Sequence, residues 1–200
     1  MGNFFICRHC KSVMGGEESE RELDEDGLKQ SLSLSNKLAE KINENTIIYA
    51  SPFKRALDSL APLKIKYPNV KIVPSQSLKE INIGKSEKFT KHQIIEKMWS
   101  DPNFKVDGGE SQLECFSNMK NFLEKTFEEF KNNKNIIYVT HGNLIGIILK
   151  FYFSLDFNFS SWKEISMPDL YELQFGKDYK ILGYKRDVEK IDNLFYVKKN

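Results

Sequence analysis

Two of the three histidines in the sequence, His9 and His141, directly follow short apolar segments. Arg8 precedes His9, and a second arginine, Arg55, lies just beyond a third apolar segment. Imidazole and guanidinium groups that converge on one point form an anion pocket, and phosphate is the ligand that suits such a pocket best. The remaining histidine, His92, lies among polar residues of a predicted helix and is expected at the surface.

The three apolar segments are short, rich in β-branched and aromatic residues, and apolar on both faces, which is typical of strands buried in a parallel sheet. They cover residues 4–7, 46–50 and 135–140. In open α/β sheets, ligands bind at the carboxyl ends of the strands. His9 and His141 are therefore expected to share one crevice, although they lie far apart in the sequence.

Helical segments alternate with these strands. Helices are predicted at residues 26–42, 53–67, 91–99, 111–130 and 143–153. Further strands are predicted at residues 70–73 and 170–175, with a possible edge strand at 180–184. The alternation predicts a three-layer α/β/α sandwich with a mixed, mostly parallel central sheet. Because no repeat, low-complexity tract or flexible linker interrupts the pattern, residues 1–200 are expected to form a single domain.

The composition excludes several classes of protein. With 40% hydrophobic, 29% charged and 12% aromatic residues, the chain is unlike collagen, coiled coils and disordered proteins. A net charge of +2 provides no overall field to attract nucleic acid or an anionic membrane. No apolar run of about eighteen residues occurs, so no transmembrane span is expected. Three cysteines cannot form a disulfide framework in a chain of this size, and the cytoplasm is the expected location.

The segment Phe5-Ile6-Cys7-Arg8-His9-Cys10 resembles the Arg-His-Gly signature of the histidine phosphatase superfamily, branch 1, whose members have a phosphoglycerate mutase-like fold. The resemblance continues, in the same order, at residues 23–30, 47–56, 78–84, 108–111 and 139–142. Arg-His alone is a weak signal, whereas collinear segments from residue 4 to about residue 150 make a specific one. The resemblance implies a phosphoglycerate mutase-like α/β/α sandwich.

The resemblance also implies a role for each matched side chain. His9 would be the nucleophile that forms a phosphohistidine, and Glu80 would donate a proton to the leaving oxygen. Arg8, Arg55 and His141 would bind the phosphoryl oxygens, with His141 part of the catalytic set. Phosphoryl transfer requires little more than an in-line nucleophile and positive charge around the phosphoryl group. No metal and no cofactor are implied, because the two arginines supply that charge.

The implied activity is that of a histidine acid phosphatase-type phosphomonoesterase, a metal-independent hydrolase. Its substrate would be a small phosphorylated molecule, with a phosphoprotein as an alternative. For this chemistry His9 must be unprotonated on its attacking nitrogen, and His141 serves best as a protonated donor. Glu80 must have a raised pKa in order to act as an acid near neutral pH. The oligomeric state is not predicted.

Several residues depart from the family pattern. Cys10 replaces the usual glycine, and an exposed thiol beside cationic groups would be prone to oxidation. Gly15 replaces a frequent asparagine, whereas Ser12 retains a hydroxyl that would bind phosphate. Seven acidic residues between Glu17 and Asp26 are expected to form a solvated loop near the mouth of the pocket, where they would disfavour highly anionic substrates.

Three alternatives stay open. A mutase would use the same phosphohistidine but return the phosphoryl group to the bound product. A non-catalytic phosphate or phosphopeptide binder could share the fold, although such a binder has no need of the acid Glu80. Cys7 and Cys10 form a C-x-x-C motif, which is typical of redox dithiols and zinc sites. Further metal ligands at short spacing are missing from the sequence, and Cys7 is more simply a small apolar residue of a buried strand.

Overall fold

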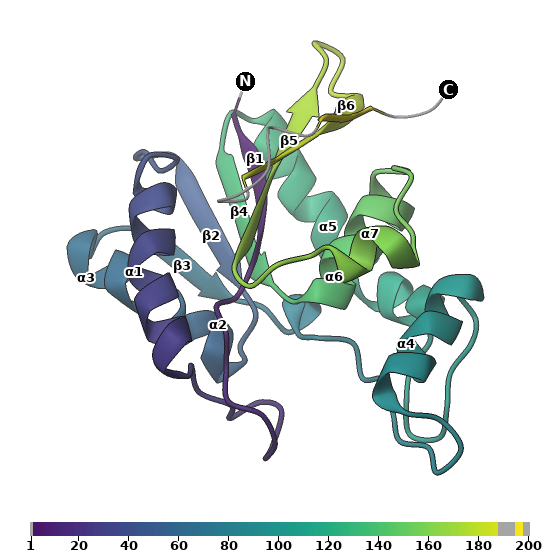
Figure 1. Ribbon diagram of the computed structural model, residues 1–200. Coiled ribbons are helices and arrows are strands. Elements are labelled where there is room, and N and C mark those ends of the chain that lie inside the picture. Colours follow the sequence, from purple (N-terminus) through teal and green to yellow (C-terminus); the bar gives the residue numbers. More distant parts are fainter. Residues whose placement is uncertain (1, 188–194, 198–200) are drawn as a thin grey trace.

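A computed structural model describes residues 2–187 and 195–197 of the chain (Figure 1). Within these residues, seven strands form one sheet in the order β3-β2-β4-β1-β5-β6-β7. The strands are β1 (Phe4–Arg8), β2 (Thr46–Ala50), β3 (Lys71–Pro74), β4 (Asn135–Thr140), β5 (Asp169–Phe175), β6 (Ile181–Asp187) and β7 (Phe195–Val197). β1 therefore lies at the centre of the sheet although it is the first strand of the chain.

The sheet is mixed. β3, β2, β4 and β1 pair in parallel, whereas β5 pairs antiparallel with β1, and β6 and β7 continue antiparallel from β5. The predicted mixed sheet is confirmed. The strand predicted at 180–184 is present as β6, but its expected place at the edge of the sheet is wrong, because β7 pairs with its outer side.

The helices cover both faces of the sheet (Figure 1). They are α1 (Glu25–Ala39), α2 (Lys54–Asp58), α3 (Ala61–Lys66), α4 (Lys91–Ser100), α5 (Gln112–Lys131), α6 (Gly142–Ile147) and α7 (Phe159–Lys163). Asp24, Thr90 and Ser111 accept hydrogen bonds from free backbone N–H groups at the starts of α1, α4 and α5. Among the described residues, no helix combines the length and apolar character that crossing a membrane requires.

Two of the predicted helices are interrupted. The segment predicted as one helix at 53–67 forms α2 and α3, because Pro62 has no N–H to continue the helical bonding and instead occupies the first turn of α3. Ser59, at the break, accepts a hydrogen bond from the Cys10 N–H at 2.8 Å. The helix predicted at 143–153 begins as α6 and continues as a π-helical turn over Ile148–Tyr152.

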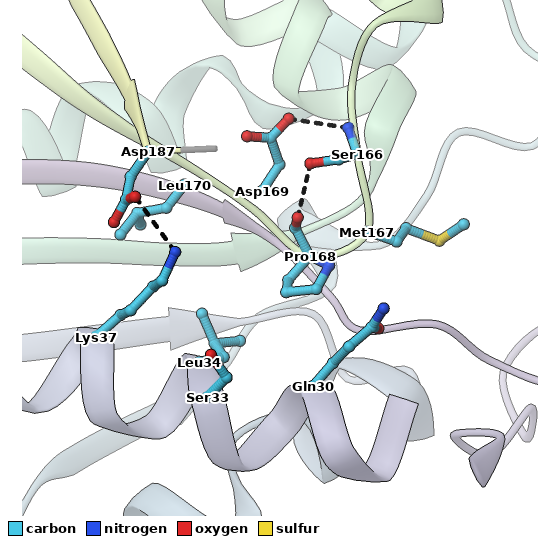
Figure 2. A pocket seen from close by; sticks show the side chains of 10 residues that line it. All are labelled: Gln30, Ser33, Leu34, Lys37, Ser166, Met167, Pro168, Asp169, Leu170 and Asp187. Carbon is cyan, nitrogen blue, oxygen red and sulfur yellow. Dashed lines mark hydrogen bonds and ion pairs between the residues drawn. The ribbon is translucent and has the colours of Figure 1, made fainter. Parts of the chain in front are cut away.

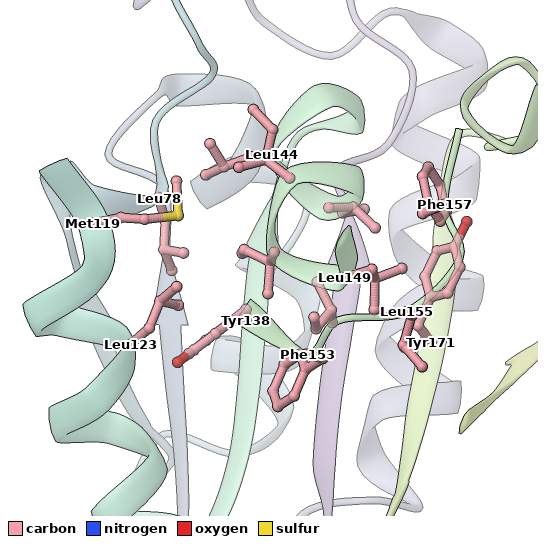
Figure 3. Close-up of a cluster of buried hydrophobic side chains, with 14 of the residues drawn as sticks. Leu78, Met119, Leu123, Tyr138, Leu144, Leu149, Phe153, Leu155, Phe157 and Tyr171 are labelled. Carbon is pink, nitrogen blue, oxygen red and sulfur yellow. The ribbon is translucent and has the colours of Figure 1, made fainter. Parts of the chain in front are cut away.

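Residues of each central strand alternate between two apolar layers. Phe4 and Ile6 of β1 pack with residues of α5 and α6, whereas Phe5 and Cys7 pack with residues of α1 and α3. Figure 3 shows the first layer, in which Tyr138 of β4 lies among leucine and phenylalanine side chains from several elements. Burial on both faces explains why these strands are apolar throughout, and it confirms the three-layer sandwich.

Candidate active site

The two strand-end histidines come together. β1 and β4 run in parallel, with Arg8 paired opposite Thr140, so the next residue of each strand is delivered to the same edge of the sheet. The rings of His9 and His141 are 4.9 Å apart between centroids, and both are buried. Arg55, in the first turn of α2, reaches both rings from the end of β2.

His9 is held as a neutral imidazole with a defined tautomer. Its Nδ1 lies 2.6 Å from the carbonyl oxygen of Cys10, so Nδ1 carries the proton and donates it. Its Nε2 accepts a hydrogen bond of 3.1 Å from Arg55 Nε. Burial, together with the positive charges of Arg55 and Arg8, lowers the pKa of His9 to about 3. The Nε2 lone pair is therefore available for chemistry at neutral pH once Arg55 is displaced from it.

His141 is also neutral in the free protein, so the expectation of a protonated donor is wrong for this state. Its Nδ1 lies 3.2 Å from Arg55 Nη2 and accepts from it, and its Nε2–H donates to Ser51 Oγ at 2.7 Å. Burial lowers the pKa of His141 well below its usual value, and the neighbouring His9 and Arg55 lower it further. The sequence could not reveal this, because burial and a nearby arginine are properties of the folded chain.

Arg8 is oriented by the segment that leads into β5. Its Nη1 donates to the carbonyl oxygens of Ile165 at 2.8 Å and Ser166 at 3.3 Å. The Ser166 N–H in turn donates to the carboxylate of Asp169 at 3.0 Å (Figure 2). Asp169 is fully buried and accepts hydrogen bonds of 3.0 and 2.8 Å from Arg186 Nε. A buried ion pair thus fixes the backbone that holds Arg8.

Glu80 lies in the loop that follows β3, beside the charge of Arg8. Thr140 Oγ1, at the end of β4, donates to the carbonyl oxygen of Leu78 at 2.7 Å and fixes this loop to the sheet. The backbone of Asn143 donates a hydrogen bond to the Glu80 carboxylate. Burial raises the pKa of Glu80, although Arg8 acts in the opposite direction. The raised pKa is the property that a proton donor requires.

The segment from residue 78 to 84 is fixed against the segment from 108 to 111, so two of the matched motifs lie side by side. Asn82 donates from its side chain to the carbonyl oxygen of Gly108 at 2.8 Å, and Glu110 N–H donates to the Asn82 carbonyl oxygen at 2.8 Å. Gly84 has a positive φ of 70° beside the backbone of Gly109, where a side chain would collide. These contacts position the loop that carries Glu80.

Ser12 is buried, and its hydroxyl oxygen accepts a hydrogen bond of 2.8 Å from Arg21 Nη2. Sequence reasoning gave Arg21 no role. Its charge nevertheless lowers the pKa of both His9 and His141, after burial and the two other arginines. Arg21 Nη1 also donates to the carboxylate of Glu18 at 3.0 Å. Arg21 lies in a loop without periodicity, so only its isolated positive charge in an acidic segment could have singled it out.

The substitution at Cys10 is accommodated without strain. Among the described residues other than glycine, only Asn133, Ser154 and Tyr179 have a positive φ, so the backbone at Cys10 does not require glycine. Cys10 is completely buried, and burial raises the pKa of its thiol to about 11. The thiol is therefore neither exposed nor activated for oxidation. In the described part of the chain, no cluster of three or more His, Cys, Asp or Glu side chains is arranged to hold a metal ion.

The acidic segment between residues 17 and 26 is not simply solvated. Asp24 caps α1 through the N–H of Gly27 at 2.8 Å, and Asp26 lies 2.6 Å from Lys11. Glu18 lies closest to the pocket, with a carboxylate oxygen 3.2 Å from Arg55 Nη2. The predicted loop near the mouth of the pocket is confirmed, but part of its negative charge is neutralised by these pairs.

This fold and this arrangement of two histidines, two arginines and a half-buried glutamate agree with a comparison to known families. The family description of the histidine phosphatase superfamily, branch 1, matches residues 4–185. The chain therefore belongs to the histidine phosphatase superfamily. A search of curated protein sequences found no match.

Solved structures share the fold over nearly the whole chain. A mycobacterial glucosyl-3-phosphoglycerate phosphatase in complex with inorganic phosphate superimposes with a TM-score of 0.72 and 18% identity, covering 94% of this chain and 96% of the other. A mutant phosphoserine phosphatase from Entamoeba histolytica in complex with phosphoserine gives a TM-score of 0.67 and 18% identity, covering 92% and 96%. YhfR from Bacillus stearothermophilus gives a TM-score of 0.69 and 17% identity, covering 90% of this chain and 94% of the other. At these identities the likeness establishes a common fold.

Proposed function

We propose that the protein is a phosphomonoester hydrolase of the histidine acid phosphatase type, which works without a metal and through a phosphohistidine on His9. The hydrogen bonding of His9 is the observation that carries the proposal. Its Nδ1–H donates to the Cys10 carbonyl, which leaves the Nε2 lone pair as the reactive site beside Arg55. A neutral imidazole surrounded by guanidinium groups combines a nucleophile with stabilisation of the phosphoryl charge.

In the first step, His9 Nε2 attacks the phosphorus atom and forms a P–N bond while the P–O ester bond breaks. The departing oxygen takes the proton of Glu80, whose raised pKa keeps it protonated at a higher pH than an exposed glutamate. Arg8, Arg55 and His141 donate hydrogen bonds to the three remaining phosphoryl oxygens. In the free protein the single N–H of neutral His141 is bonded to Ser51 Oγ, so donation to the phosphoryl group requires a proton on Nδ1. The incoming negative charge favours that proton, because it raises the pKa of His141.

In the second step, the Glu80 carboxylate takes a proton from a water molecule as the water oxygen attacks phosphorus. The P–N bond breaks, its electron pair returns to His9 Nε2, and inorganic phosphate leaves. Each turnover thus consumes one water molecule and restores His9 and Glu80 to their starting protonation states. In this scheme the hydroxyl of Ser12 contributes to phosphate binding beside Arg21.

We further propose a small phosphomonoester as the substrate, with a phosphoprotein as the alternative. Two of the proteins that share the fold support this class, since their structures contain inorganic phosphate and phosphoserine respectively. A single domain, a cytoplasmic location and the absence of nucleic-acid and membrane partners remain parts of the proposal, supported by the uninterrupted alternation of strands and helices and by the nearly balanced charge.

The test is hydrolysis of p-nitrophenyl phosphate in the presence of EDTA by the wild-type protein, a His9→Ala variant and a His92→Ala control. We expect turnover by the wild type and the control, and a loss of several orders of magnitude in His9→Ala, because the nucleophile is absent. Quenching with alkali during turnover should trap a phosphoryl group that is stable to alkali but labile to acid, on the wild type and the His92→Ala control but not on His9→Ala. Phosphate release from a panel of alkyl phosphates would then rank substrates.

Two results would contradict the proposal. Turnover that EDTA abolishes would show that a metal is required, and turnover that persists in His9→Ala would remove the phosphohistidine. A folded wild-type protein that hydrolyses no member of the panel, yet exchanges phosphoryl groups between bound monoesters, would establish the mutase alternative. Phosphate binding with neither reaction would establish the non-catalytic binder.

A further inference from the structure

Most of the N–H donors of Arg55 already have partners in the free protein. Its Nε donates to His9, and its Nη2 contacts both His141 Nδ1 at 3.2 Å and a carboxylate oxygen of Glu18 at 3.2 Å. Its Nη1 donates to the backbone carbonyl oxygen of Glu18. The Arg55 side chain is only 3% exposed, so very little of it is accessible to solvent while these partners are in place.

The Glu18 carboxylate makes the contacts that an incoming anion would make. Besides Arg55, it accepts hydrogen bonds of 3.0 and 3.1 Å from Arg21 Nη1, and it lies 3.7 Å from the ammonium of Lys91. Burial raises the pKa of Glu18, but the charges of Lys91, Arg21 and Arg55 together bring it below its usual value. Glu18 is therefore a carboxylate at neutral pH, held by three cations beside the two histidines.

A phosphoryl group needs the same donors. Arg55 is the guanidinium that contacts His9 Nε2, so a phosphoryl group in line with Nε2 must bond to Arg55 at close range. Two anions cannot share one guanidinium face, because they would repel each other at contact distance. We propose that Glu18 is an internal competitor of the substrate, and that phosphate binds by displacing its carboxylate from Arg55. This inference rests on the proposed function and adds a specificity device to it.

The structure shows which part of the loop would move. Arg21 is anchored by two further hydrogen bonds, to the Val13 carbonyl oxygen and to Ser12 Oγ, both 2.8 Å, and its side chain is only 13% exposed. The Glu18 side chain is 50% exposed, in contrast to its two arginine partners. Rotation of Glu18 toward solvent would therefore free both Arg55 Nη2 and Arg21 Nη1, and Arg21 would remain in place to bind the phosphoryl group.

Displacement sets a threshold for ligands. A dianionic phosphate offers three terminal oxygens and two charges, whereas Glu18 offers two oxygens and one charge, so the exchange favours phosphate. A monocarboxylate ligand would replace Glu18 by an equivalent group and gain little. The displacement cost is the same for every anion, so Glu18 sets a minimum strength of binding that a phosphate monoester exceeds more readily than a single carboxylate.

The test compares binding of inorganic phosphate to the wild-type protein, Glu18→Gln and Glu20→Gln by isothermal titration calorimetry at constant ionic strength. Glu20 is an exposed carboxylate of the same loop, so its variant makes the same change in charge away from Arg55. We expect the dissociation constant to fall about three- to tenfold in Glu18→Gln, as for the loss of one partly exposed charged hydrogen bond, and to stay unchanged in Glu20→Gln.

Phosphate binding requires no turnover, so this test is independent of the proposed hydrolysis. Tighter binding by Glu18→Gln alone supports the inference even if no monoester is hydrolysed. Equal dissociation constants in all three proteins would overturn it, even in an active phosphatase. An equal decrease of the dissociation constant in Glu18→Gln and Glu20→Gln would also overturn it. The loss of one negative charge anywhere in the loop would then explain the tighter binding, without displacement of Glu18. The absence of phosphate binding in all three proteins would remove the anion pocket itself.

Discussion

At the scale of single residues, Arg55 organises the pocket. One guanidinium bonds to Nε2 of His9, to His141 and to Glu18. These contacts keep both imidazoles neutral, because an additional proton on either ring would be buried next to a positive charge. In the proposed mechanism, the cationic neighbours that stabilise the phosphoryl group are therefore the same groups that keep His9 in its neutral, reactive form.

Neutral histidines make the stability of the free protein depend on pH. The pKa of His9 is lowered from 6.5 to about 3, and that of His141 is lowered from 6.5 as well, so the unfolded chain binds protons that the folded chain does not. In phosphate-free buffer, we expect the free energy of unfolding to fall as the pH decreases below 6.5. Each histidine contributes up to about 1.4 kcal/mol per pH unit. Urea unfolding monitored by fluorescence measures this dependence.

Glu80 acts with the opposite sign in the same experiment. Its pKa is raised from 4.5, so the folded chain takes up a proton before the unfolded chain does, and acidification stabilises the fold through this group. Replacing it in Glu80→Gln should therefore make the loss of stability below pH 6.5 steeper. A wild-type profile that stays flat between pH 6.5 and 4.5 would show that the histidines are not buried as neutral rings.

At the scale of elements, the segment that enters β5 supports the pocket through Arg8. Its carbonyl groups hold Arg8, and Asp169 and Arg186 fix the segment through a buried ion pair. Figure 2 shows that the other side of the segment lines a cavity with α1, where Lys37 and Asp187 form an exposed ion pair of 3.2 Å. Asp169 and Asp187 thus both form ion pairs beside this segment, but the Asp169 side chain is buried and the Asp187 side chain is exposed.

This difference gives a matched pair of variants. Asp169→Asn removes one partner of a buried ion pair and should destabilise the protein by about 3–5 kcal/mol. It should also weaken inhibition by vanadate, since the carbonyl groups that orient Arg8 lose their support. Asp187→Asn removes an exposed pair and should change stability by less than about 1 kcal/mol, with inhibition unchanged. Urea unfolding and vanadate inhibition measure the two effects, and wild-type inhibition in a folded Asp169→Asn would refute the positioning role.

Elements were predictable from the sequence to the extent that local signals determine them. The strands at 4–7, 46–50 and 135–140 are confirmed, because burial on both faces leaves an unbroken apolar run. The prediction of one continuous helix at 53–67 is wrong, because Pro62 separates the segment into two helices. The apolar pattern alone did not indicate this break. The convergence of His9 and His141 followed from strand ends and a topological rule, whereas Glu18 and Arg21 reach the pocket through a loop whose path no local pattern encodes.

At the scale of the whole molecule, the pocket combines a rigid part with a more exposed part. The strand ends that carry Arg8, His9 and His141 belong to β1 and β4, which have hydrogen-bonded neighbours on both sides and buried side chains. Glu18 extends from an exposed loop instead. The residues proposed to bind phosphate from the strand ends are thus fixed, while Glu18, the group proposed to move, lies where its movement disturbs little of the core.

Amide hydrogen exchange should reproduce this division. We expect the slowest exchange in β1 and β4, because opening them disrupts two pairings and both apolar layers. Exchange should be faster in β3, an edge strand with partly exposed side chains, and fastest in the loop around Glu18. Mass spectrometry of peptic peptides resolves these segments. Protection of β3 equal to that of β1 would mean that the whole sheet opens as one unit.

The central place of β1 also has a consequence for the order in which the protein is made. Strand β1 pairs with β4 and β5, which both follow it in the chain, and β5 begins only at Asp169. The apolar residues of β1 must therefore remain unpaired, and in need of protection from aggregation, until β4 and β5 have been synthesised. Because Arg8 is oriented by Ile165 and Ser166, the candidate pocket is complete only after the segment that enters β5 has been synthesised and has packed beside β1.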